Sequence, residues 1–109
     1  TMVKTTASGG RRMNALAVIR YHAPLEVIEA ATEAHRAYLR ELKGAGTLVV
    51  SGPVVPRAGG VLLLRVPDDY PAAALDAVCD GAPFWKQGLA NYELLPWNPV
   101  IGREGLDRL

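Results

Sequence analysis

His35 is the side chain best suited to proton chemistry in this chain of 109 residues, because an imidazole titrates near neutral pH. It falls between Ile28 and Leu39 on a stripe of apolar residues with helical spacing. A buried polar ring needs a hydrogen-bond partner, since leaving it unpaired costs about 1–3 kcal/mol. Two interpretations stay open: a core histidine satisfied by backbone or water, or a general base in a cleft between a helix and a sheet.

Three further polar residues are candidates for binding a small substrate. Arg20 interrupts an apolar strand, where it either binds a substrate carboxylate or forms an edge or interface salt bridge. His22 ends that strand, as a loop-side residue or as a site residue. Ser51 either caps the following turn or orients a substrate or His35. It is not expected to be a nucleophile, because the chain has no G-x-S-x-G elbow.

Aromatic residues are expected to form the walls of a cleft, or else to belong to the core or surface. The candidates are Tyr38, Phe84 and Trp85. Metal binding is not expected, because two histidines and one cysteine without paired carboxylates make a poor ligand set. A nucleotide phosphate is not expected at Gly59-Gly60 either, since no Gly-rich phosphate-loop pattern surrounds it.

The elements that must position these residues alternate in a recognisable order. Strands are predicted over 16–22, 48–52, 60–66 and 91–97, helices over 24–43 and 70–78, and a short helical turn over 84–89. This β-α-β-β-α-β order is typical of a ferredoxin-like α+β domain, an antiparallel sheet with helices on one face. The domain is expected over residues 14–102. Tails are expected over 1–13, where Thr1 is read as an expression remnant, and over 103–109.

Composition limits the partners that this domain can have. A net charge of +1 leaves no excess for nucleic acid, and no apolar run is long enough for a membrane. One cysteine and no signal sequence favour the reducing cytoplasm. The sheet face without helices needs a cover, and a second copy of the chain is the simplest one. We therefore expect a homodimer.

Six short stretches, in this order, resemble the YciI-like (YCII-related) domain family. They are R-Y-H-A-P-L-E (20–26), A-H-R-A-Y-L (34–39), S-G-P (51–53), G-G-V-L-L-L (59–64), P-F-x-x-x-G-L (83–89) and W-N-P-V-I-G (97–102). The resemblance implies a dimeric ferredoxin-like α+β barrel with a cleft centred on a histidine and an aspartate. It also implies cofactor-free chemistry, such as chloride elimination from an aromatic catabolite, with lactone isomerisation in neighbouring families.

Carried over by position, the resemblance makes His35 the family histidine and Ser51 the family serine. The family aspartate usually precedes Pro-Phe, a place that Ala82 holds here, and Asp80 is the nearest acid. Either Asp80 orients His35 after a one-residue insertion, or this member has lost the pair. The expected function is elimination, isomerisation or cyclisation of a small aromatic or lactone-like acid, with His35 as base. The alternative is a non-catalytic small-molecule-binding or accessory dimer.

Overall fold

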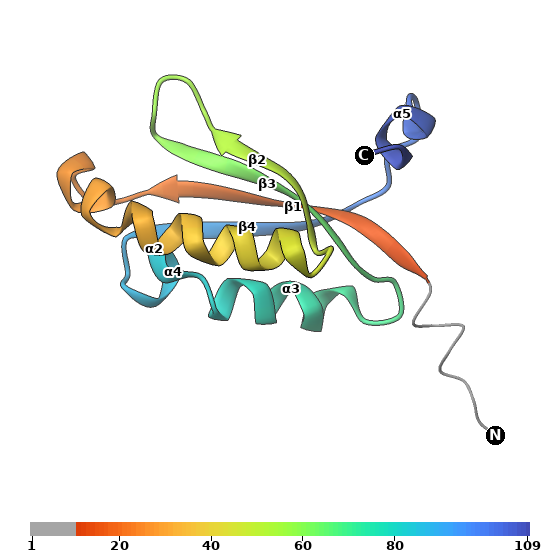
Figure 1. Ribbon diagram of the computed structural model, residues 1–109, viewed down its shortest axis with the longest axis horizontal. Coiled ribbons are helices and arrows are strands. Elements are labelled where there is room, and N and C mark those ends of the chain that lie inside the picture. Colours follow the sequence, from red (N-terminus) through yellow and green to blue (C-terminus); the bar gives the residue numbers. More distant parts are fainter. Residues whose placement is uncertain (1–10) are drawn as a thin grey trace.

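The computed structural model describes residues 11–109, which form four strands and four helices (Figure 1). In chain order these are β1 (Arg12–Tyr21), α2 (Leu25–Gly44), β2 (Leu48–Pro53), β3 (Gly59–Pro67), α3 (Pro71–Asp80), α4 (Pro83–Lys86), β4 (Ala90–Trp97) and α5 (Arg103–Asp107). No helix in this part of the chain is long and apolar enough to cross a bilayer.

The strands form one antiparallel sheet in the order β2-β3-β1-β4. The central strand β1 sets the register, because Leu16 lies opposite Leu63 of β3 and opposite Leu95 of β4. Helices α2 and α3 run along one side of the sheet (Figure 1). The predicted ferredoxin-like α+β fold is therefore confirmed.

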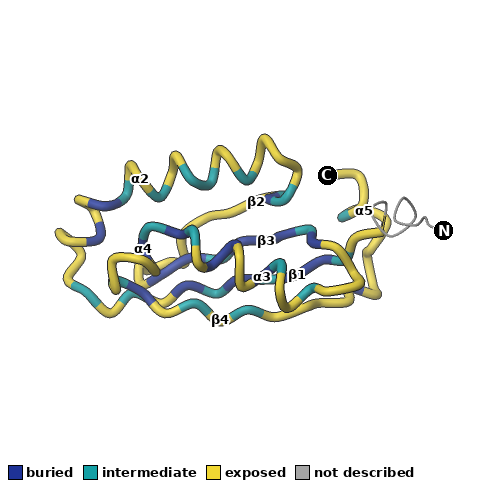
Figure 2. Tube along the Cα trace, turned by 90° about the horizontal axis from the view of Figure 1, so that it is seen from below, coloured by how far each residue is buried: buried dark blue, intermediate teal, exposed yellow. Residues whose placement is uncertain are grey.

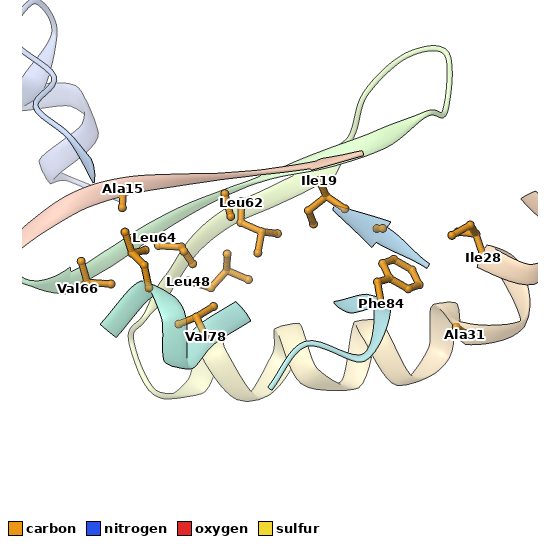
Figure 3. Packing of buried hydrophobic residues seen from close by; sticks show 13 residues of the cluster. Ala15, Ile19, Ile28, Ala31, Leu48, Leu62, Leu64, Val66, Val78 and Phe84 are labelled. Carbon is orange, nitrogen blue, oxygen red and sulfur yellow. The ribbon is translucent and has the colours of Figure 1, made fainter. Parts of the chain in front are cut away.

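The core lies between the sheet and these helices, where strand alternation directs every second side chain. Buried and less buried residues alternate along β1 and β3, and Figure 2 shows this alternation as dark blue and teal segments of the two strands. Ile28 of α2 and Phe84 of α4 are almost fully buried among them, and Figure 3 shows Phe84 pointing from its short helix into the cluster. Burial of each such large side chain contributes about 1.5–3 kcal/mol.

The opposite face of the sheet carries an apolar row that neither α2 nor α3 covers. Strand pairing aligns Val50, Leu63, Leu16 and Leu95 across all four strands. Val50 is 54% exposed and Leu95 is 40% exposed. Helix α5 and the chain terminus lie at one end of this face. Arg65 holds them there by donating hydrogen bonds to the carbonyls of Leu106, at 2.9 Å, and of Leu109, at 3.0 Å.

Several boundaries differ from those predicted. Strand β1 begins at Arg12, inside the predicted tail, because Arg12 pairs with Pro67 of β3 and its guanidinium donates to the carbonyl of Gly46. That glycine has a φ of 81° and lies just after the end of α2, where a left-handed conformation commonly ends a helix. Helix α5 was not predicted, since 103–109 has no apolar period. Most of the predicted N-terminal tail lies outside the described residues.

Candidate functional site

A pocket of about 320 Å³ opens between α2 and the β2–β3 hairpin. Its walls come from four parts of the fold. Strand β1 contributes Ile19 and Tyr21, helix α2 contributes Thr32, His35, Arg36 and Leu39, the hairpin contributes Ser51, Gly52, Pro53, Arg57, Gly60, Val61 and Leu62, and α4 contributes Phe84. This volume is at the lower end of the range for small-molecule sites, about 300–1,000 Å³.

Stacking against Phe84 fixes the position of the His35 ring. The two ring centroids are 4.2 Å apart and the planes differ by 15°. Phe84 is only 1% exposed, and its second aromatic contact is an edge-to-face packing with Tyr21, with the ring centroids 5.7 Å apart. The imidazole is therefore held against a rigid part of the core.

The environment of His35 favours its neutral form. Burial, followed by the positive charges of Arg36 and Arg57, lowers the pKa of His35 from 6.5 to about 4. The ring is thus unprotonated at neutral pH and able to accept a proton. Its Nδ1 atom is buried and has no hydrogen-bond partner within residues 11–109.

Arg57 supplies a cation from the loop between β2 and β3. Its Nη2 atom donates to the Thr32 hydroxyl at 3.2 Å, and its Nη1 atom lies 4.0 Å from the Glu29 carboxylate. The guanidinium carbon is 5.9 Å from the centre of the Tyr21 ring. These contacts hold Arg57 at the pocket, beside a neutral histidine. The sequence did not identify it, although a lone arginine in a Pro- and Gly-bounded loop was a signal.

The glycine pair at the start of β3 explains why this loop can approach β1 so closely. A Cβ atom at Gly59 would lie 1.8 Å from the carbonyl oxygen of Ile19, and one at Gly60 would lie 3.0 Å from the carbonyl oxygen of Gly52. A side chain at Gly59 would separate the strands, and one at Gly60 would crowd the backbone of Gly52. The pair is thus required by backbone packing, and it places the loop of Arg57 over the pocket.

Of the residues predicted for the site, His35, Ser51 and Phe84 line one pocket. Arg20 does not, because it lies on the opposite sheet face and forms a salt bridge of 2.9 Å with Glu93, the edge interpretation that the sequence left open. Tyr38 does not line the pocket either. Its hydroxyl donates to the carbonyl of Val78 at 2.6 Å and so links α2 to α3. The remaining aromatic, Trp85, is 44% exposed outside the pocket.

The predicted contact between Asp80 and His35 is absent, and so is one from His22. Asp80 is the exposed last residue of α3, outside the pocket lining, and no carboxylate bonds the buried ring nitrogen of His35. The acid connected to the pocket is Glu29, through Arg57. His22 is exposed and only its backbone is engaged, donating to the carbonyl of Leu89. Asp80 is thus close to Pro83 in the sequence, but its carboxylate does not contact the imidazole of His35.

Metal ligands do not gather at this pocket: across residues 11–109 no three His, Cys, Asp or Glu side chains cluster as a metal site would require. The groups available to a ligand are instead a neutral imidazole, the Ser51 hydroxyl, two guanidinium groups and an apolar wall. Such a set can bind a planar anion and accept a proton from it.

Comparison with known proteins agrees with the fold. A family model described as the YCII-related domain matches residues 13–98. A solved structure of 5-chloro-2-hydroxyhydroquinone dehydrochlorinase (TftG) from Burkholderia phenoliruptrix AC1100, in complex with 2,5-dihydroxybenzoquinone, is similar with a TM-score of 0.70. The sequence identity is 22%, over 81% of this chain and 96% of that chain. No curated protein sequence matches.

Proposed function

Because the chain belongs to the YCII-related family, we propose that it is a small enzyme that moves a proton on a small anionic substrate, with His35 as general base. The reaction is elimination, isomerisation or cyclisation of an aromatic or lactone-like acid. The observation that carries this proposal is the pocket itself, where His35 stacks on Phe84 beside Arg36 and Arg57. The dehydrochlorinase activity named for the structural neighbour is a reaction of the same class.

Substrate charge is central to the proposed mechanism. A base with a pKa of about 4 is unprotonated at neutral pH but accepts protons weakly. Two of the three causes of that low value are the cations Arg36 and Arg57. Burial is the largest cause and persists in the complex, but an anionic substrate offsets the effect of the two cations and so raises the pKa of His35. The bound substrate thereby strengthens the base that deprotonates it, while Ser51 helps to orient it.

A homodimer is the proposed assembly. The row formed by Val50, Leu63, Leu16 and Leu95 leaves apolar side chains exposed along the full width of the sheet, and a second copy of the same face would bury them. The cytoplasm is the proposed compartment, since the single cysteine, Cys79, is a free thiol.

The alternative function is a binding module without catalysis. Two observations favour it: Ala82 stands where the family aspartate is expected, and no carboxylate of residues 11–109 hydrogen-bonds the buried Nδ1 of His35. Without such an orienting group a histidine base loses part of its efficiency.

Deuterium incorporation distinguishes these two functions without knowledge of the natural substrate. The protein is incubated in D₂O with 2,5-dihydroxybenzoquinone and a panel of enolisable cyclic acids and lactones, and exchange is followed by NMR. We expect catalysed exchange that falls about 10²–10⁴-fold in His35→Gln. The matched control is His22→Gln, which alters the exposed histidine outside the pocket. Full exchange activity in His35→Gln overturns the proposal. Binding at the pocket without exchange of any probe supports the alternative.

A further inference from the structure

A second hollow of about 370 Å³ continues from the His35 pocket along α2. It runs between the C-terminal half of that helix and the edge strand β2. The two hollows share Arg36, Leu39 and Ser51 in their walls. They are therefore neighbouring compartments of one cleft.

The second compartment has an apolar floor and a basic rim. Leu39 of α2 and Leu48 and Val49 of β2 form the floor, Val50 borders it at the edge of the sheet, and Arg36, Arg40 and Lys43 of α2 form the rim. No acidic residue of the described part of the chain lines it. The three cations are spaced by four and three residues, which places them on one face of the helix.

Most of this positive charge is uncompensated. Arg40 lies 3.3 Å from Glu33, in an ion pair whose partners are both well exposed. Arg36 and Lys43 form no ion pair with any residue of the described chain, 11–109. The rim can therefore attract the anionic end of a ligand, and the floor can contact the apolar part of the same ligand.

We propose that the substrate has two parts: a head beside His35 and Phe84, and a flexible arm along the α2–β2 groove that ends in an anionic group near Lys43. This inference rests on the proposed function for the head, and it adds the arm and its charge. The helix rises about 1.5 Å per residue, so the arm spans roughly 10 Å. A carboxylate or a phosphate on a short aliphatic chain meets both requirements.

A matched pair of probes isolates the charge at the end of the arm. The acid is 5-(4-hydroxyphenyl)pentanoate, the neutral partner is its primary amide, and binding is measured by calorimetry. An exposed ion pair contributes a few tenths to about 1 kcal/mol, so each unpaired cation should favour the acid by about 2–5-fold. In amide-resolved NMR spectra, the acid should shift the signals of Val49 and Lys43 as well as those of the His35 pocket.

Two substitutions change this preference in opposite directions. Lys43→Gln should weaken binding of the acid about 2–5-fold and leave the amide unaffected. Glu33→Gln releases Arg40 from its ion pair and should strengthen binding of the acid. Arg108→Gln removes a cation that lines neither compartment and should change nothing. Added salt should reduce the preference for the acid, because it screens exposed charges.

Equal affinity of the acid and the amide in the unmodified protein overturns the inference, and so does an unchanged acid affinity in Lys43→Gln. Failure of the acid to bind at millimolar concentration has the same meaning. These measurements do not depend on turnover. If the acid binds no better than the amide but deuterium exchange still requires His35, the arm alone is refuted. If the acid binds better than the amide but no probe exchanges, the proposed catalysis alone is refuted.

Discussion

Acidification should destabilise the protein through His35, over a pH range that its environment defines. The pKa of His35 is about 4 in the folded chain and 6.5 in its ordinary state. Below pH 6.5 the unfolded chain therefore binds a proton that the folded chain still refuses. The contribution of the neutral imidazole to the free energy of unfolding is complete above pH 6.5. It is lost progressively as the pH falls from 6.5 to about 4.

The size of this loss follows from the environment of the ring. A shift from 6.5 to about 4 corresponds to about 3.5 kcal/mol, at about 1.4 kcal/mol per pKa unit. The ring borders an open pocket and its two cationic neighbours are exposed to solvent, so screening reduces this value to about 1–2 kcal/mol. A glutamine at this position cannot titrate, so His35→Gln should lack this part of the pH dependence.

Urea unfolding at pH 7.5, 6.0, 5.0 and 4.5 measures the effect for the unmodified protein, His35→Gln and the control His22→Gln. As the pH falls from 7.5 to 4.5, the free energy of unfolding of His35→Gln should rise by about 1–2 kcal/mol relative to that of the unmodified protein. His22→Gln should follow the unmodified protein. If the His35 ring protons titrate near 6.5 in NMR spectra, or if the His35→Gln difference is independent of pH, the ring is not desolvated and the reasoning is refuted.

Three further outcomes are expected. Phe84→Ala should lower the free energy of unfolding by about 3–5 kcal/mol in urea titrations, and a loss below about 1 kcal/mol would contradict the central position of this ring. Leu63→Lys should give a monomer in analytical ultracentrifugation and a lower melting temperature, because association no longer stabilises the folded chain, whereas a persistent dimer excludes the sheet face as the interface. Gly59→Ala should prevent normal folding, judged by circular dichroism, because its Cβ would collide with the backbone of Ile19; Gly52→Ala, which meets nothing, is the control, and normal folding of both variants rules out the close approach.

The arrangement of elements was predictable from local patterns, and parts of the site were not. Helix α2 carries a regular stripe, so the sequence placed His35 on the side that faces the sheet, where the pocket lies. The position of Asp80 depends on where α3 ends relative to α2, and no local pattern encodes that relation. Arg57 reaches the pocket only because a hairpin folds back over the sheet, which is a long-range property of the chain.

The predicted boundaries of the first strand and of the C-terminal tail were wrong for related reasons. Strand β1 extends to Arg12 because β3 offers it partners, not because its own residues favour a strand. Helix α5 depends on Arg65, a residue about 40 positions earlier, for the hydrogen bonds that fix it. Tertiary contacts of this kind override weak local preference.

The loop that carries Arg57 has a consequence for how such a protein diversifies. Its exit is fixed by Gly59, which has no room for a Cβ atom, and by the crowded Gly60, while residues 54–58 between the strands are exposed. Substitutions there change what reaches the pocket without disturbing a buried contact. Exposed loop positions on a fixed scaffold accept change at little cost in stability. New substrate preferences should therefore arise first in residues 54–58, with the strands and the histidine helix kept as a constant frame.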